Sequence, residues 1–189
     1  MSPLFETERL HIRLMTPEDD SFILRLFNAP NWLQFLGDRN IKTPEDARQY
    51  IEDVYLKNYE DLGFGAWVLT LKTSGEPIGI CGLFQRPYLA LPDLGYALLP
   101  AFEGMGYAWE AASATLSYAG KRLEKEELLA IVSEANTKSV RLLEKLGFAY
   151  KDQLRLPDDR QVAVWQWQTP CPTTLTGSRE PPAISPPPR

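Results

Sequence analysis

The chain has 189 residues, 44% of them hydrophobic and 24% charged, a composition that excludes a largely disordered or fibrous protein. Its formal net charge of −5 disfavours nucleic acid as the main partner, because neutralising phosphates needs a clustered excess of Lys and Arg. No apolar run approaches the roughly 20 residues that cross a bilayer, and no signal peptide is visible before Arg9. We therefore expect a cytoplasmic protein without a membrane partner.

The first third of the chain predicts one strand and two helices. Residues 10–14 alternate between apolar and polar, as in a half-buried strand. The sequence Thr-Pro-Glu-Asp begins at Thr16 and again at Thr43. Thr caps a helix, Pro fits its first turn, and acids favour the positive end of its dipole. These signatures predict helices over about 16–27 and 43–57.

The rest of the chain predicts mostly strands, around one central sheet in a mixed α/β fold. After Thr169 it fills with Pro, Ser and Thr, so we expect a folded domain over 1–168 and a tail over 169–189. The expected elements are strands at 66–71, 78–85 and 94–99, a helix after Gly106 to about Gly120, a strand at 128–132, a helix at 137–146, and strands at 148–154 and 161–168.

Two cysteines and one histidine give no sign of a metal or a disulfide framework. Cys81 and Cys171 form no CxxC pair, and His11 has no neighbours at metal-ligand spacing. His11 alternates with apolar residues that face inward, so we expect its ring to face away from the packed side and to take no part in catalysis. We expect no metal.

A glycine-rich segment carries the clearest chemical signal. A strand leads into a loop with Gly104 and Gly106, and this loop opens a helix whose free amides and dipole suit a pyrophosphate. The spacing alone is weak, because two glycines can simply form a tight turn. A dinucleotide motif needs a third glycine where Trp109 stands, and the Gly-Lys-Ser/Thr of a Walker loop is missing, so both of these sites are disfavoured.

The residues of this loop resemble the coenzyme A loop of the GNAT superfamily of N-acetyltransferases. They are most similar to the branch that contains the ribosomal-protein N-terminal acetyltransferases. Further segments match that branch in the same order, so that the resemblance covers about 6–168. The matching segments are 8–13, 45–51, 77–79, 104–111 and 136–148.

This resemblance implies a mixed, mostly antiparallel sheet of about seven strands, splayed near its middle and flanked by about four helices. It also implies acetyl-CoA as co-substrate, lying in the splay. Backbone groups of Leu98 and Leu99 would hold the pantetheine and the acetyl carbonyl, while Asn136 and Ser139 would face the thioester. The amides that would bind the pyrophosphate belong to Glu103, Gly104, Met105, Gly106, Tyr107 and Ala108.

The chain departs from the family pattern at three positions. Ala101 stands where Gln or Arg is common, and Glu103 replaces a Trp that often precedes the first glycine. An acid beside a pyrophosphate is unfavourable unless it points away, so cofactor affinity is expected to fall. Leu143 replaces the Tyr that protonates the leaving thiolate in many relatives, and Ser139 is the alternative donor.

An amine acceptor also needs a base and a binding surface. We expect Asp93 to be the base, because it begins the strand that leads to the cofactor loop; the competing interpretation is an edge charge in solvent, and Glu103 is a second candidate. The candidate acceptor-site residues are Trp32, Phe35 and Tyr88, with packing as the alternative role for each.

The sequence therefore predicts an acetyl-CoA-dependent N-acetyltransferase, a monomer or homodimer, that acts by direct attack of an amine. A protein amino terminus and a small-molecule amine both remain open as acceptors. Two alternatives also remain: a non-catalytic module that keeps the coenzyme A pocket, and an interaction protein that acts through its Pro-rich tail.

Overall fold

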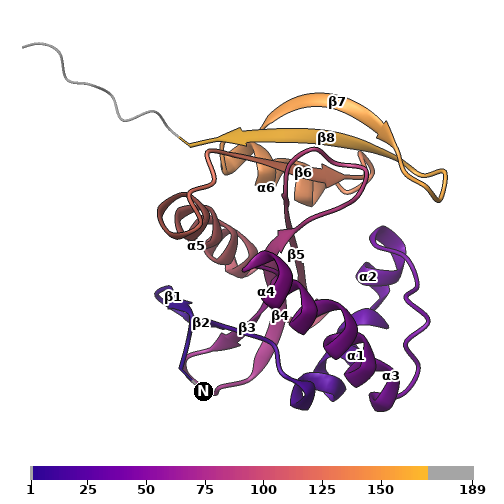
Figure 1. The fold of residues 1–189 in the computed structure, drawn as a ribbon, viewed down its shortest axis with the longest axis vertical. Coiled ribbons are helices and arrows are strands. Elements are labelled where there is room, and N and C mark those ends of the chain that lie inside the picture. The colour runs from indigo at the N-terminus through magenta and orange to yellow at the C-terminus, as the bar shows by residue number, and fades with distance from the viewer. Residues whose placement is uncertain (1, 170–189) are drawn as a thin grey trace, which may run out of the picture.

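The computed structural model describes residues 2–169, whose strands form one sheet (Figure 1). The strand order is β1-β2-β3-β4-β5-β6-β8-β7, and every neighbouring pair is antiparallel except β5 and β6. The predicted sheet type is confirmed, with eight strands instead of seven, because a two-residue strand pairs with β2 at the edge. In order from β1 to β8 the strands are Phe5–Glu6, Leu10–Arg13, Ala66–Leu71, Pro77–Phe84, Asp93–Leu98, Glu127–Val132, Ala149–Arg155 and Gln161–Gln168.

The structure has one α-helix more than the four expected, when the continuous helical stretch from 44 to 62 is counted as a single helix. In that stretch a π-helical segment, Ile51–Leu56, joins α3 to α4, and Gly63 ends it in the left-handed conformation. The unpredicted helix is α2, which follows Ala29, a residue with no side chain that can cap. The α-helices within residues 2–169 are α1 (Asp20–Phe27), α2 (Pro30–Phe35), α3 (Pro44–Tyr50), α4 (Lys57–Leu62), α5 (Tyr107–Arg122) and α6 (Thr137–Lys145).

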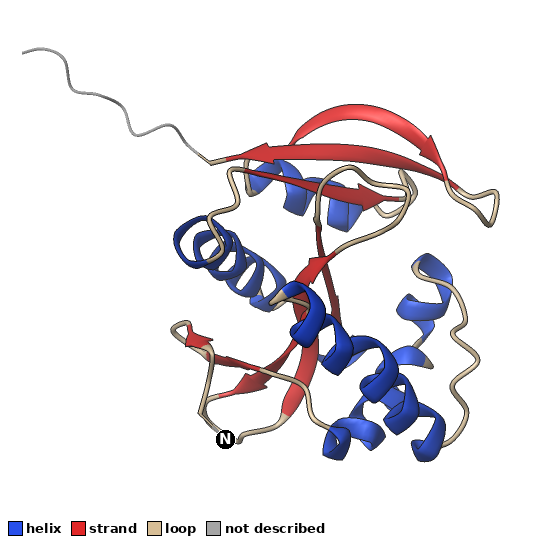
Figure 2. Cartoon of the chain, in the orientation of Figure 1, coloured by secondary structure: helices blue, strands red, loops and turns tan. Residues whose placement is uncertain are grey.

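Helices cover both faces of the sheet, as Figure 2 shows. One apolar cluster joins the sheet to α5 and includes Leu94 and Leu98 of β5. The other joins it to α1 and α3, and Ala97 of β5 and the following residue, Leu99, pack against that cluster. Alternation along β5 therefore gives this strand one side towards α5 and another towards α1–α4.

The splay predicted near the middle of the sheet is confirmed at β5 and β6. These parallel strands pair only at Asp93 and Leu129 and then separate towards their carboxyl ends. β5 remains paired with β4 from Asp93 to Leu98. Beyond Asp93, the other edge of β5 therefore has no strand partner among the described residues.

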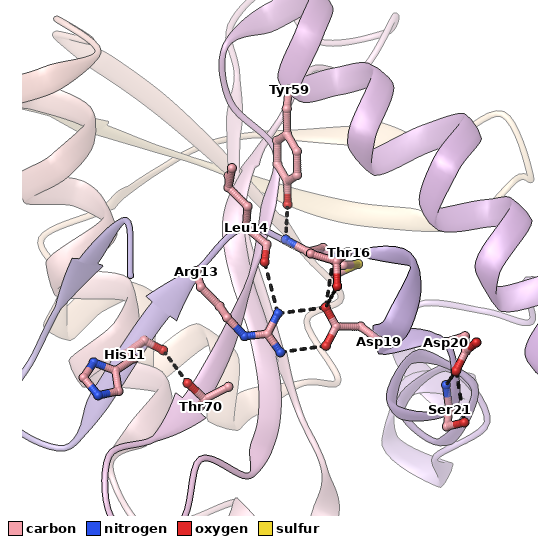
Figure 3. Close-up of polar contacts among 10 residues, drawn as sticks. His11, Arg13, Leu14, Thr16, Asp19, Asp20, Ser21, Tyr59 and Thr70 are labelled. Atoms are coloured by element: carbon pink, nitrogen blue, oxygen red, sulfur yellow. Dashed lines mark hydrogen bonds and ion pairs between the residues drawn. The ribbon is translucent and has the colours of Figure 1, made fainter. Parts of the chain in front are cut away.

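A buried ion pair fixes the first helical layer to the sheet (Figure 3). Both terminal nitrogens of Arg13, at the end of β2, donate to the carboxylate of Asp19 at 2.8 and 2.6 Å. The same carboxylate accepts the backbone N–H of Thr16 at 2.9 Å, and Asp19 is only 7% exposed. Nearby, Tyr59 accepts the N–H of Met15 at 3.2 Å, which ties α4 to the same corner.

The other predictions at this level concern the cysteines, the tail and the membrane. Cys81 is buried in β4 as a free thiol, whereas Cys171 lies outside the described residues. The tail over 169–189 also lies outside them, apart from Thr169. No helix within residues 2–169 is both long enough and apolar enough to span a bilayer.

Replacing Asp19 by Ala should lower the free energy of unfolding by about 3 kcal/mol, because it leaves the half-buried Arg13 guanidinium without its partner. Urea denaturation followed by circular dichroism measures the change. The control is Asp61→Ala, an exposed acid near the end of α4, which should shift the free energy by less than about 0.5 kcal/mol. Equal effects of the two substitutions would show that the ion pair contributes nothing.

Candidate active site

The glycine loop ends in a cluster of free backbone amides at the start of α5. Gly104 and Gly106 both adopt the left-handed conformation, with φ of 74° and 84°, which other residues rarely take. Gly106 occupies the N-cap position and has no side chain that could satisfy the first turn. The N–H groups of residues 104–109 have no acceptor within the described part of the chain, whereas the N–H of Glu103, also predicted to bind the pyrophosphate, already donates to the carbonyl of Pro100 at 3.3 Å. Together with the helix dipole, these amides fit a pyrophosphate.

An arginine and a glutamate hold this loop against the amino-terminal edge of the sheet. Glu110 accepts the side-chain Nε of Arg9 at 2.7 Å, its backbone N–H at 2.8 Å, and the Thr7 hydroxyl at 2.5 Å. Arg9 also donates to the carbonyl of Met105 at 3.0 Å, and its guanidinium lies 4.2 Å from the ring centre of Tyr107. Burial raises the pKa of Glu110, but these hydrogen bonds outweigh it and lower the pKa below its usual value, so the carboxylate stays charged.

The edge of β5 is a second element of the site. The N–H of Leu99 donates to the carbonyl of Ile78 in β4 at 2.9 Å. This N–H, one of the backbone groups predicted to hold the cofactor, is therefore not free to bind it. Because successive residues of a strand direct their backbone groups to opposite edges, those of Leu94, Tyr96 and Leu98 face the opening towards β6. The carbonyl of Leu98 accepts the Asn31 amide at 3.0 Å, which brings α2 to the same opening.

Helix α6 supplies the facing side. The Asn136 side chain accepts the N–H of Ser139 at 3.2 Å and thereby caps α6. The hydroxyl of Ser139 lies near the phenol of Tyr96, whose pKa is about 12 because burial raises it and Ser139 only partly offsets this. Leu143 is 2% exposed and belongs to the apolar core. Tyr96, a partly buried residue of β5, thus lies beside a predicted catalytic residue.

Glu103 points towards two helices. Its Oε1 accepts the Asn31 amide at 2.5 Å, and its Oε2 lies 3.2 Å from the ammonium of Lys138 in α6. The amide nitrogen of Asn31 therefore contacts two acceptors, Glu103 and the carbonyl of Leu98. A lysine partner offsets the charge of Glu103, so the expected conflict with a bound pyrophosphate is reduced.

Asp93 is buried at the point where the splay begins. It is 1% exposed, so the alternative of an edge charge in solvent is wrong. Its two carboxylate oxygens lie 2.9 and 3.1 Å from Nε of Arg86. Burial raises the pKa of Asp93 to about 6, against the opposing effect of Arg86. The group therefore changes protonation close to neutral pH, as a catalytic base must.

The profile of the acetyltransferase (GNAT) domain family matches residues 9–149 of the chain. The chain belongs to the GNAT acetyltransferase family. It is similar to the uncharacterized N-acetyltransferase YoaA of Bacillus subtilis, at 30% identity over 82% of this chain and 88% of that protein. GNAT acetyltransferases use acetyl-CoA, which confirms the predicted co-substrate.

Solved structures share the fold along most of the chain. An acetyltransferase from Agrobacterium tumefaciens aligns with a TM-score of 0.74 at 28% identity, covering 88% of this chain and 95% of that one. The ribosomal-protein-S5-alanine acetyltransferase of Vibrio fischeri gives 0.73 at 19%, covering 87% and 95%. A spermidine N-acetyltransferase of Vibrio cholerae, in complex with CoA and spermine, gives 0.69 at 21%, covering 84% and 95%.

The residues expected to bind the acceptor of this GNAT acetyltransferase do not lie together. Trp32 lines a cavity of about 210 Å³ between α2, the helical stretch from 44 to 62 and the end of β4. Phe35 does not line it, and its carbonyl accepts Arg160 from the β7–β8 turn at 3.1 Å. Tyr88 does not line it either, and its hydroxyl accepts a hydrogen bond from Arg86 at 3.3 Å.

His11 lies on β2, where its Nδ1 is 3.6 Å from a carboxylate oxygen of Glu6.

The sequence did not predict that Arg9, Asn31 and Tyr96 lie at the candidate site. Arg9 and Asn31 reach the site from elements remote in sequence, with separations of 96 residues to Met105 and 67 to Leu98. No local motif marks such a contact. For Tyr96 a signal existed, since its position two residues before Leu98 places both on the same side of β5.

Replacing Glu110 by Gln should weaken acetyl-CoA binding about tenfold, because the variant loses the charged acceptor that positions Arg9 and the loop. Calorimetric titration measures the dissociation constant. Glu144→Gln, on the exposed face of α6, serves as the control and should bind as the parent protein does. If Glu110→Gln folds normally and binds acetyl-CoA unchanged, the Arg9–Glu110 pair does not organise the loop.

Proposed function

We propose that this protein transfers the acetyl group of acetyl-CoA directly to a primary amine. The observation that carries the proposal is the separation of β5 from β6 beside the free amides at the start of α5. The pyrophosphate would lie on the amides of residues 104–109, next to the partly exposed Arg9 guanidinium. The pantetheine would extend into the opening along the unpaired edge of β5.

The transfer forms a carbon–nitrogen bond and breaks the carbon–sulfur bond of the thioester. Amides of Tyr96 and Leu98 face the opening and are the donors available to the developing oxyanion. The Ser139 hydroxyl donates a hydrogen bond to the departing thiolate, which Leu143 cannot do. The Tyr96 phenol keeps its proton at neutral pH, because burial raises its pKa to about 12, and its hydroxyl has no hydrogen-bond partner among the described residues. The released thiolate then takes up, through water, the second proton that the ammonium group loses as it becomes an amide.

Asp93 receives the proton that the attacking amine must lose. Amines are mostly protonated at neutral pH, so a base is required before or during attack. A carboxylate with a pKa near 6 is ionised at pH 7 and still basic enough to accept a proton. Arg86 holds it in place through a single N–H and leaves other lone pairs free.

Replacing Asp93 by Asn should lower kcat/KM for acetyl transfer by about a hundredfold and remove the acidic limb of the pH profile. In the parent protein kcat/KM should rise as the pH increases through about 6, because only the carboxylate can accept a proton. Thiol release from acetyl-CoA with a panel of amines, followed from pH 5 to 9, gives both results, and mass spectrometry of the amine confirms the product.

Thermal unfolding must accompany this assay, because Asn leaves the partly buried Arg86 without its counter-ion. A folded variant with unchanged turnover across the pH range would remove Asp93 from the mechanism. If the parent protein binds acetyl-CoA but releases no thiol with any amine, it is a non-catalytic coenzyme A-binding module and the proposed transfer is wrong.

A further inference from the structure

The cavity lined by Trp32 adjoins β5 on the face opposite α5. Its lining residue Arg86 pairs with Asp93, at the start of β5. Its lining residue Phe84 covers Gly95, where a Cβ atom would lie 2.6 Å from the phenyl ring. Asn31, next to Trp32 in α2, contacts the carbonyl of Leu98. No residue of β5 lines the cavity, but these contacts place it beside β5, on the side of the sheet away from α5.

The walls of this cavity carry positive charge and no negative charge. Arg39 and Arg86 line it, and none of its lining residues has a carboxylate. Arg86 is already neutralised by Asp93, whereas Arg39 forms no ion pair with any residue in the described range 2–169. In a chain with a net charge of −5, a pocket with an unneutralised guanidinium group is suited to an anion.

A buried donor in the wall points to the same chemistry. Trp32 is 6% exposed, and its indole Nε1 has no hydrogen-bond partner among the described residues. An indole N–H can only donate, and since Trp32 lines the cavity, a bound acceptor is one group that could satisfy it. Burial raises the pKa of Tyr55, another lining residue, so its hydroxyl keeps its proton and is a further donor. Tyr50 and Phe84 complete an aromatic wall.

We propose that this cavity binds the acceptor, and that the acceptor is a small primary amine that also carries a carboxylate or phosphate group. This inference rests on the proposed acetyl transfer, because it names the substrate class of that site. The volume of about 210 Å³ suits a small molecule. A polyamine would place a second ammonium group beside Arg39 with no carboxylate to pair with, which is unfavourable.

Binding to the CoA-loaded protein tests the substrate class without requiring turnover. The anionic probes are 4-aminobutyrate and 2-aminoethyl phosphate, compared with butylamine, which lacks the anion, and 1,4-diaminobutane, which replaces it with a cation. Calorimetry should show at least one anionic probe binding about tenfold or more tightly than butylamine, with diaminobutane weakest. The better anionic probe distinguishes a carboxylate from a phosphate acceptor.

Arg39→Gln locates the effect in this cavity. The variant should lose about tenfold in affinity for the better anionic probe and stay within about twofold for butylamine, because only the anion needs the guanidinium. Arg25→Gln, an exposed arginine at the end of α1 that does not line the cavity, should leave all probes unchanged. Arg86 is left intact because it holds Asp93.

The outcomes separate this inference from the proposed function. Three binding results would each overturn the inference: diaminobutane binds most tightly, all probes bind equally, or no probe binds. Equal effects of Arg39→Gln and Arg25→Gln would also overturn it. Acetylation of diaminobutane in the thiol-release assay, with the anionic amines left unmodified, would also overturn it while leaving acetyl transfer intact. Conversely, Arg39-dependent binding of an anionic amine that is never acetylated would contradict the transfer and the acceptor assignment together, and would leave only an anion-selective cavity.

Discussion

The separation of β5 from β6 just beyond Asp93 and Leu129 is the constraint on which the rest of the site depends. A strand edge inside a sheet normally satisfies its N–H and C=O groups with a neighbour, and leaving them unpaired is costly unless something else bonds to them. The unpaired backbone groups at the β5 edge therefore favour a bound partner that can hydrogen-bond to them. One of them, the carbonyl of Leu98, already accepts a hydrogen bond from Asn31. The same opening places the start of α5 beside α6.

The cofactor loop and the proposed acceptor cavity lie on opposite faces of the sheet. On the α5 side lie the free amides of the glycine loop, fixed by Arg9 and Glu110. On the other side, α2 and the helical stretch from 44 to 62 line a cavity whose wall includes Arg39 and Arg86, the partner of Asp93. β5 separates the two regions, so a co-substrate and an acceptor can meet at its splayed segment without competing for the same groups.

Local chemistry made much of the fold predictable. The Thr-Pro-Glu-Asp signature at Thr43 predicted the start of α3, where the Thr43 side chain accepts the N–H of Asp46. The signature at Thr16 begins a 3-10 helix, Pro17–Asp19, so that α1 itself starts at Asp20, later than predicted. Helix α2 was not predicted, because the side chain of Ala29 cannot cap its first turn and its six residues are too few to show a helical hydrophobic period. The family resemblance predicted a cofactor loop around Gly104 and Gly106. It could not show that Glu103 pairs with Lys138 or that Asp93 is buried, because both follow from packing between distant segments.

Amide hydrogen exchange with and without saturating acetyl-CoA, followed peptide by peptide, tests most directly whether the splay is the cofactor site. Binding should slow exchange in the segment 94–99 and in the loop 103–109, while β2 and β3 exchange as before. NADH at the same concentration should protect neither segment. Protection confined to other elements, or equal protection by NADH, would contradict the assignment of the opening between β5 and β6 to acetyl-CoA.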